Sequence, residues 1–427
     1  MTASPQPDLA TRPDLATRPD RRLAPRPFPT HLASAAGSWL SSRTALPWLK
    51  AALPWLKNGS LQSSASGRRL YALAAEIDRL GAERVAAALD REIAQRAQDY
   101  LTGLEAYRRH PFRRRQPAAP VLWQEGTTRL LDYGDGRAAA AVLVVPSLVN
   151  RYHVLDLLPE RSFLRHLAAA GLRPIVVDWD APGDAERGLD LGGYVARLDR
   201  AVTAIARCTG GPLAILGYCM GGLLALAAAL RCRQRVAALA VLATPWDFHA
   251  GQPAAARLVA LATGGLAPSG TCADTLAVEF VQSFFFLIDP FAAERKFVRL
   301  ARLDPHSGAA RTFVALEDWI NDGVPLGLAV ARDCILSWYR DNEPGRGVWR
   351  VAGQHVQPHR LGRPVLVVIP GRDRIVPPLA AEPLAAAFGP VDVLRPALGH
   401  VGMMAAADAP AMLWTPIAHW LQTHVAG

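Results

Sequence analysis

The sequence predicts an α/β protein built on a doubly wound, mostly parallel sheet, with a helical insertion and a helical N-terminal extension. From about residue 121 onward, short apolar runs alternate with segments of helical length, which is typical of such a sheet. The apolar runs are rich in β-branched residues and lack polar alternation, as expected of parallel strands covered on both faces. The rhythm stops between about residues 244 and 349 and is absent before residue 117.

Six strands and five helices are predicted from this pattern. In chain order, we expect strands over residues 139–145, 174–178, 213–216, 236–242, 365–369 and 391–394, and helices over residues 160–170, 192–207, 220–230, 379–388 and 411–423. Together they define a catalytic-type domain over residues 117–427.

The first 66 residues read as a low-complexity basic tail without fixed structure. They are rich in proline and contain two tandem duplications, DLATRP at residues 8–19 and ALPWLK at residues 45–57. A second interpretation exists for the latter, because Trp48 and Trp55 beside lysines could sit at an apolar–water interface. The tail interpretation is the default.

Residues 67–116 are expected to be helical. Apolar residues recur at three- and four-residue spacing from Leu70 to Leu104, and Gly81 divides them into two helices. The segment ends in a cluster of arginines, which suits a solvated helix C-terminus.

The break in the strand rhythm, about residues 244–349, reads as a helical lid inserted between two strands of the sheet. It is rich in aromatic residues, among them Trp246, Phe284, Trp338 and Tyr339. These side chains could line an apolar substrate channel, but most of them are expected to form the core of the insertion.

The distribution of charge along the chain argues against nucleic-acid binding by residues 121–427. Residues 1–120 hold 19 of the 47 basic and ten of the 37 acidic residues, so they carry +9 of the net charge of +10. The remainder is almost neutral, and we therefore expect no nucleic-acid binding by the main domain. No cysteine or histidine cluster has metal-ligand spacing, so neither a metal nor a cofactor is expected.

The N-terminus lacks the apolar run of a signal peptide, and no segment reaches the ~18 apolar residues of a membrane span. We therefore expect a cytoplasmic protein with reduced thiols.

The strongest motif is LGYCMGG at residues 216–222, which places Cys219 in a G-x-nucleophile-x-G elbow. A sharp strand-to-helix turn exposes such a nucleophile, and side chains at the flanking glycines would clash. The alternative, a buried structural cysteine, is weakened by two residues later in the chain. Asp373 comes after the strand over residues 365–369 and His400 after the strand over residues 391–394, in the order that an elbow enzyme requires.

These three residues predict a Cys–His–Asp triad at the carboxyl edge of the sheet. His400 would take the proton of the Cys219 thiol, and Asp373 would orient His400. The N–H of Met220 and that of Leu148 or Val149, in the loop after the strand over residues 139–145, are the candidate oxyanion donors.

Several motifs in one order resemble the polyhydroxyalkanoate synthase family over about residues 100–425. They are residues 145–162 (VPSLVNRYHVLDLLPERS), 176–194 (VVDWDAPGDAERGLDLGGY), the LGYCMGG elbow, 242–248 (LATPWDF), 315–323 (ALEDWINDG), 337–342 (SWYRDN), 371–378 (GRDRIVPP) and 399–402 (GHVG). The chain departs from the family pattern at Arg374, where members commonly carry histidine.

The resemblance implies the α/β-hydrolase fold and an acyltransferase that moves 3-hydroxyacyl groups from CoA thioesters, through an acyl-cysteine, to a hydroxyl chain end. It places the nucleophile, carboxylate and base on Cys219, Asp373 and His400. It also implies a hydrophobic polyester product, a location at the polymer-granule surface and a homodimer or second subunit. CoA phosphates would need local arginines, for which Arg151 and Arg374 are the candidates.

Two other functions stay open at this point. A cysteine-dependent hydrolase of the same fold, like the dienelactone hydrolases, would share the GYCMGG motif. A non-catalytic polymer-granule-binding protein would not need the triad.

Overall fold

The computed structural model describes residue 22 and residues 25–58, 64–115, 119–134, 140–251 and 274–425. The chain forms two compact units, one comprising Arg113–Ile288 and Ala315–Gly427, the other Asp20–Phe112 and Asp289–Val314. The duplication at residues 8–19 lies outside the described residues.

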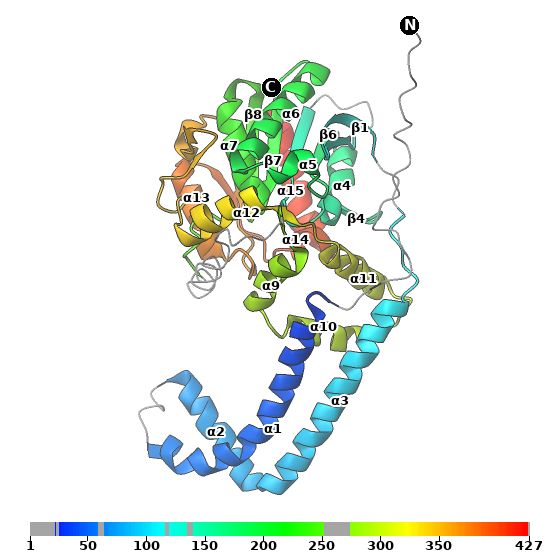
Figure 1. Cartoon of the computed structure of the whole chain (residues 1–427), viewed down its shortest axis with the longest axis vertical. Coiled ribbons are helices and arrows are strands. Elements are labelled where there is room, and N and C mark those ends of the chain that lie inside the picture. Colours follow the sequence, from blue (N-terminus) through cyan, green and yellow to red (C-terminus); the bar gives the residue numbers. More distant parts are fainter. Residues whose placement is uncertain are drawn as a thin grey trace. The chain divides into compact units, whose positions relative to one another are not determined.

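An eight-stranded sheet forms the centre of the first unit (Figure 1). Its order is β1-β2-β6-β3-β7-β8-β13-β14, and every pair from β6 to β14 is parallel. The strands are β1 (Val121–Glu125), β2 (Thr128–Asp132), β3 (Ala140–Val145), β6 (Leu172–Asp178), β7 (Leu213–Tyr218), β8 (Val236–Leu242), β13 (Val365–Val368) and β14 (Asp392–Leu394). All six predicted strands are confirmed.

The antiparallel edge made by β1 and β2 was not predicted. β1 pairs with β2, and β2 pairs antiparallel with β6. These strands are five residues each and are only partly buried, so they lack the continuous apolar run that marks the central strands.

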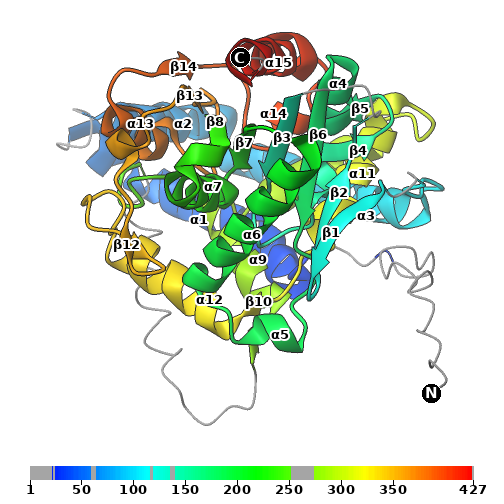
Figure 2. The same ribbon diagram turned by 90° about the horizontal axis from the view of Figure 1, so that it is seen from above.

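Helices cover both faces of the sheet (Figure 2). One face carries α6 (Leu191–Thr209) and α7 (Met220–Arg231), and the other carries α4 (Phe163–Ala169) and α15 (Thr415–Val425). The remaining helices of the sheet connections are α5 (Asp184–Arg187), α13 (Pro378–Phe388), α14 (Gly402–Ala405) and the short turns η3 (Tyr152–Leu155), η4 (Arg233–Arg235), η6 (Pro358–Arg360) and η7 (Pro410–Trp414). The doubly wound sheet is therefore confirmed.

The sheet strands are buried because both faces are covered. Every residue of β7 is buried, and β8 has a single half-buried position. Such strands leave no polar face, which is why the sequence shows them as uninterrupted apolar runs. Three two-stranded pairs complete the unit: β4 (Asp156–Leu158) with β5 (Arg161–Ser162), β9 (Thr275–Leu276) with β10 (Leu326–Gly327), and β11 (Arg350–Val351) with β12 (Gln354–His355).

The predicted lid is divided between the two units. Residues 252–273 lie outside the described residues. Helices α9 (Val278–Ile288), α12 (Leu328–Asp333) and the π-helical turn η5 (Cys334–Arg340) belong to the sheet unit. Residues 289–314, with α10 (Ala292–Ala301) and the first part of α11 (Gly308–Asn321), belong to the other unit, so the residues predicted as one lid fall in two units.

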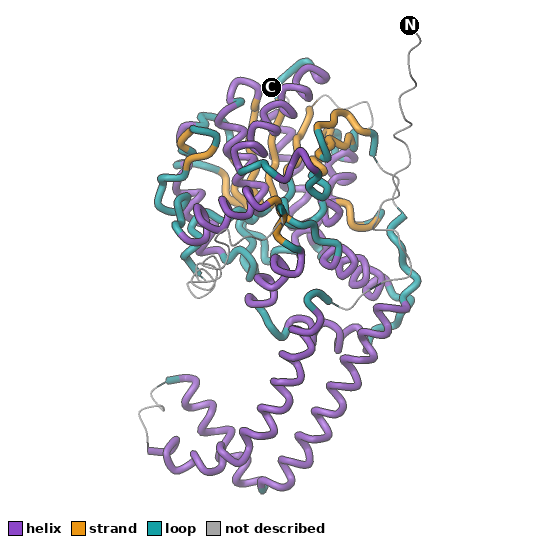
Figure 3. Tube along the Cα trace, in the orientation of Figure 1, coloured by secondary structure: helices purple, strands orange, loops and turns teal. Residues whose placement is uncertain are grey.

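The second unit is helical, with α1 (Phe28–Asn58), α2 (Ala65–Leu80), α3 (Ala82–Arg109) and α10 (Figure 3). The break at Gly81 is confirmed. Helix α3 meets α10 at Gly103, where a Cβ atom would lie 2.0 Å from the carbonyl oxygen of Phe297. The core of this unit is formed by Tyr100, Leu104, Tyr107, Phe297, Leu300, Ala310 and Val314.

The prediction of a tail without fixed structure over residues 1–66 is wrong for about half of that segment, which forms a helix. Helix α1 covers Phe28–Asn58 and accommodates Pro47 and Pro54. The side chains of Ala35 and Leu46 are buried, so packing stabilises this helix. The proline content of the segment gave no sign of that packing. Trp48 and Trp55 stay on the surface, with 77% and 82% of their area exposed.

Among the residues that the structure describes, none of the helices is long and apolar enough to cross a membrane.

Candidate active site

Cys219 occupies the turn between β7 and α7, where the backbone is strained. Its φ of 58° and ψ of −129° lie in a region that non-glycine residues avoid. The turn is held by hydrogen bonds from Cys219 N–H to the Leu242 carbonyl and from Gly222 N–H to the Cys219 carbonyl, both 2.9 Å. The half-buried thiol therefore lies at the N-terminus of α7, whose dipole stabilises negative charge.

The glycines of the elbow are required by close packing. A Cβ atom at Gly221 would lie 2.2 Å from the Val145 carbonyl oxygen, and one at Gly222 would lie 1.8 Å from Thr244 Oγ1. The elbow therefore packs directly on the end of β3 and on the residues after β8. Only glycine permits this approach, which brings the nucleophile position against the loop after β3.

Asp373 and His400 reach the same edge of the sheet from the loops after β13 and β14. Asp373 Oδ2 lies 2.7 Å from His400 Nδ1. The other carboxylate oxygen accepts hydrogen bonds from the N–H groups of Ile375 and Val376, both at 2.8 Å. An ionised carboxylate only accepts, so Nδ1 donates and Nε2 is left to face the thiol.

Cys219 lies close enough to His400 to act on the pKa of the imidazole. Burial opposes protonation of His400, but the Cys219 charge and the hydrogen bond to Asp373 outweigh it and raise the pKa of His400 to about 10. Tyr218 contacts His400 in two ways. Its hydroxyl donates a hydrogen bond to the His400 carbonyl at 3.2 Å, and the centroids of the two rings lie 5.2 Å apart. The surroundings of His400 therefore favour its protonated form.

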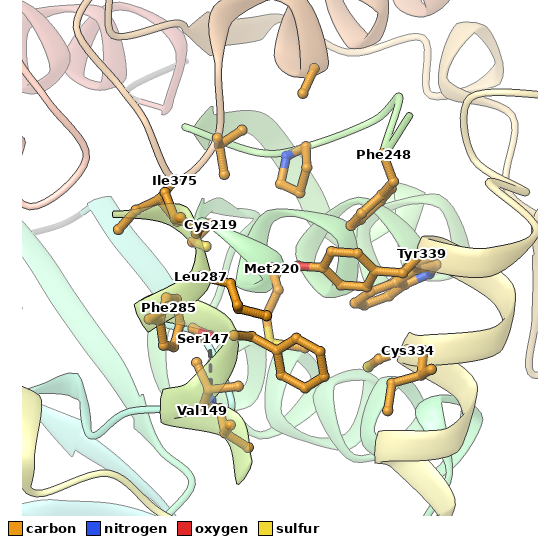
Figure 4. A pocket seen from close by; sticks show the side chains of 18 of the residues that line it. Ser147, Val149, Cys219, Met220, Phe248, Phe285, Leu287, Cys334, Tyr339 and Ile375 are labelled. Carbon is orange, nitrogen blue, oxygen red and sulfur yellow. Dashed lines mark hydrogen bonds between the residues drawn. The ribbon is translucent and has the colours of Figure 1, made fainter. Parts of the chain in front are cut away.

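An apolar cavity of about 170 Å³ opens beside Cys219 (Figure 4). Its wall comes from the elbow, from the loop after β3, and from α9, α12 and η5. The lining includes Ser147, Val149, Cys219, Met220, Phe248, Leu276, Phe284, Phe285, Leu287, Ile288, Leu326, Cys334, Ile335, Trp338, Tyr339, Ile375 and Val376. Carbon atoms dominate this wall, so the cavity suits an apolar acyl chain.

The side chains of the three candidate oxyanion residues lie in different surroundings. Met220 and Val149 line the cavity together with Cys219, whereas the Leu148 side chain is 3% exposed and belongs to the core. The N–H of Val149 makes a long hydrogen bond of 3.4 Å to Ser147 Oγ, drawn as a dashed line in Figure 4. The amides of Met220, Leu148 and Val149 stay the candidate oxyanion donors.

Neither candidate arginine lines the cavity. The guanidinium of Arg151 forms ion pairs with Asp180 at 2.7 Å and with Asp322 at 3.0 Å. Its carbonyl accepts a hydrogen bond of 2.7 Å from Trp319 Nε1. Arg151 thus joins the loop after β3 to the end of β6 and to α11, while Arg374 lies exposed beside Asp373.

The structure adds two features to what the sequence indicated, one at the cavity and one elsewhere in the sheet unit. Tyr339 was one of the aromatic residues for which the sequence left open a place in a channel wall or in the core of the insertion, and it lines the cavity. Asp156, inside the motif at residues 145–162, is fully buried and is bound by Arg165 at 3.1 Å, Arg114 at 3.4 Å and Tyr133 at 2.9 Å. The SWYRDN motif was the available signal for Tyr339, whereas nothing in the sequence identified the partners of Asp156.

Comparisons with known proteins agree with the geometry. A family model described as the alpha/beta hydrolase fold matches residues 140–263. A poly(3-hydroxyalkanoate) polymerase subunit of Haloarcula marismortui is 27% identical over 73% of this chain and 69% of its own. The chain is related to the poly(3-hydroxyalkanoate) polymerases. The corresponding subunit of Allochromatium vinosum is likewise 27% identical, over 66% of this chain and 80% of its own.

The resemblance to the polyhydroxyalkanoate synthase family is therefore confirmed, and with the parallel sheet it establishes the α/β-hydrolase fold. Among solved structures, a monoacylglycerol lipase of Paleococcus ferrophilus is 16% identical, with a TM-score of 0.44, over 70% of this chain and 99% of its own.

Within the part of the chain that the structure describes, no group of three or more histidine, cysteine, aspartate or glutamate side chains could hold a metal ion.

Proposed function

We propose that this protein is a polyhydroxyalkanoate synthase-like acyltransferase that uses Cys219, His400 and Asp373 as its catalytic triad. The observation that carries the proposal is the 2.7 Å contact of His400 with Asp373, with Cys219 on the other side of the ring, at the mouth of an apolar cavity. The names of the polymerase relatives support the same activity.

The first half-reaction loads the enzyme. The Cys219 sulfur attacks the carbonyl carbon of a 3-hydroxyacyl-CoA, and the carbonyl oxygen takes the negative charge, facing the amides of Met220 and Val149. When the tetrahedral intermediate collapses, the carbon–sulfur bond to CoA breaks and His400 donates its proton to the CoA thiolate. The product is an acyl-cysteine thioester, similar in energy to the substrate thioester.

The second half-reaction forms the polymer bond. The hydroxyl of a chain end or of the next monomer gives its proton to His400 and attacks the acyl-cysteine. The new oxyester is more stable than the thioester that breaks, so the transfer runs forward. The thioester itself supplies the activation, so this chemistry needs no cofactor or metal.

Water must stay away from the acyl-enzyme, because hydrolysis would compete with transfer. The cavity wall favours exclusion, since Phe284, Phe285, Leu287 and Ile335 surround the space beside the sulfur. This apolar wall distinguishes the synthase proposal from its alternative, a cysteine-dependent hydrolase of the same fold. A polyester product also favours a location at a polymer-granule surface.

Product analysis tests the proposal. Purified protein is incubated with 3-hydroxybutyryl-CoA, CoA release is followed with a thiol reagent, and the acyl product is sized. The synthase predicts CoA release together with oligomeric or polymeric ester, and Cys219→Ala abolishes both. Free 3-hydroxybutyrate as the sole product establishes the hydrolase instead, and CoA release by Cys219→Ala at the wild-type rate rules out the cysteine mechanism.

The same sample tests assembly. Because the relatives are named as polymerase subunits, we include a homodimer or a second subunit in the proposal. Light scattering of the purified chain, with and without substrate, measures the oligomeric state.

A further inference from the structure

Tyr339 brings a polar group into a cavity wall that is otherwise almost entirely apolar. It lies in the π-helical turn η5, a backbone irregularity that often occurs at functional sites. Figure 4 shows its ring reaching into the cavity, with the hydroxyl oxygen on the side of Met220 and Cys219. Of the tyrosine's surface, 39% remains exposed.

The ring of Tyr339 is held in one place by its neighbours. Its carbonyl is bound by His249 Nε2 at 3.0 Å, and its ring meets the edge of Phe248 with centroids 4.9 Å apart. Phe248 in turn stacks on Trp338 at 5.8 Å. A side chain fixed in this way presents its hydroxyl at a defined position, which costs little entropy on binding.

The hydroxyl itself has no hydrogen-bond partner among the described residues. Although 39% of the residue is exposed, burial around the hydroxyl and the negative charge of Cys219 raise the pKa of Tyr339, so the hydroxyl keeps its proton and stays a donor. A fixed donor without a protein acceptor, aimed into an apolar cavity, is suited to an oxygen of the bound substrate.

The acyl group bound to Cys219 offers few oxygen atoms that could accept a hydrogen bond from the Tyr339 hydroxyl. In the proposed mechanism its carbonyl oxygen faces the amides of Met220 and Val149, and Ser147 and Val149 lie across the cavity from Tyr339 in Figure 4. In a 3-hydroxyacyl group, the next oxygen lies on C3, two carbons farther from the sulfur. Tyr339, on the wall across from Ser147, is the side chain placed to meet it.

We propose that Tyr339 is a specificity residue whose hydroxyl donates a hydrogen bond to the C3 oxygen of the acyl group on Cys219. The inference rests on the proposed acyltransferase function and adds to it the feature of the substrate that is recognised. An acyl thioester without oxygen at C3 leaves the Tyr339 hydroxyl unpaired in an apolar site, so the enzyme discriminates against it.

Single-turnover acylation tests this with 3-hydroxybutyryl-CoA and butyryl-CoA, measured as the rate of CoA release. In Tyr339→Phe, we expect the ratio of the two rates, 3-hydroxybutyryl over butyryl, to fall about ten-fold, the worth of one uncharged hydrogen bond. Tyr194→Phe, which removes a hydroxyl outside the cavity, should leave the ratio unchanged. The folded state of Tyr339→Phe should persist, since the ring contacts remain.

Two results would overturn the proposal: an unchanged ratio in Tyr339→Phe, or equal loss of rate on both thioesters, which indicates a structural role. Failure of the acyltransferase function looks different, because wild type would then release CoA from neither thioester, or Cys219→Ala would release it as fast as wild type.

Discussion

Asp373 connects the backbone of its own loop to the imidazole of His400. One carboxylate oxygen accepts the N–H groups of Ile375 and Val376, and the other contacts His400 Nδ1 at 2.7 Å. The side chain is therefore fixed before it orients the histidine. This division of the two oxygens makes it possible to change the contact to His400 without unfolding the loop.

Asp373→Asn should reduce CoA release from 3-hydroxybutyryl-CoA about 10³- to 10⁴-fold, because an amide facing Nδ1 favours the wrong imidazole tautomer. The amide oxygen can still accept from Ile375 and Val376, so the melting temperature should change little. The matched control is Asp408→Asn, an exposed carboxylate, which should keep wild-type activity. A loss of less than ten-fold in Asp373→Asn would contradict the orienting role.

His400 should make stability depend on pH. Its pKa rises from 6.5 to about 10 on folding, so the protonated ring stabilises the folded state fully below pH 6.5, and this contribution is lost as the pH rises through about 10. The difference in unfolding free energy between wild type and His400→Gln should therefore shrink over that range. Urea titrations at several pH values measure it, with the exposed His419→Gln as the control. A difference that grows with pH would reverse the assigned sign.

Gly222→Ala should destabilise the elbow, because its Cβ would meet Thr244 Oγ1 at 1.8 Å and Thr244 Cβ at 2.8 Å. We expect a loss of about 1–3 kcal/mol in the free energy of unfolding, as for other overpacked sites, together with lower CoA release. The control is Gly211→Ala, where nothing lies within 4 Å of the added carbon. Equal unfolding midpoints for the two variants would show that the elbow can relax.

Asp156→Asn should destabilise the sheet unit by about 1–3 kcal/mol, because it removes the fully buried carboxylate that pairs with the partly exposed guanidinium groups of Arg165 and Arg114. The matched control is Asp184→Asn, since the Asp184 side chain is 96% exposed and its ion pair with Arg187 contributes little. Chemical denaturation measures both. A small effect at Asp156 would mean that the cluster relaxes without cost.

Much of the fold was readable from the sequence for a simple physical reason. Strands such as β7 and β8 are covered on both faces, so their burial appears directly as apolar runs in the sequence. The break between α2 and α3 is also a local property, because it lies at the single residue Gly81. Helix α1 was not predicted, because burial of Ala35 and Leu46 depends on neighbours that no local pattern reveals.

The candidate site divides in the same way. Cys219, Asp373 and His400 could be predicted because an elbow and two later strand ends follow one another along the chain in the order that the triad requires. Parallel strands bring their carboxyl ends to one edge of the sheet, so these residues were expected to meet there. The engagement of Arg151 with Asp180 and Asp322 could not be predicted, and the sequence did not decide which aromatic residues of the insertion, such as Tyr339, line the cavity. Each depends on side chains distant in the sequence.

Residue types and their spacing were enough to order the candidate catalytic groups along the chain: a nucleophile after β7, a carboxylate after β13 and a histidine after β14. Turn geometry and strand burial are local properties, so a linear pattern can express them. The folded chain was needed to learn that Arg151 is already paired with two carboxylates and that Tyr339 lines the cavity. These depend on distances between segments far apart in the chain, which packing of the whole unit sets.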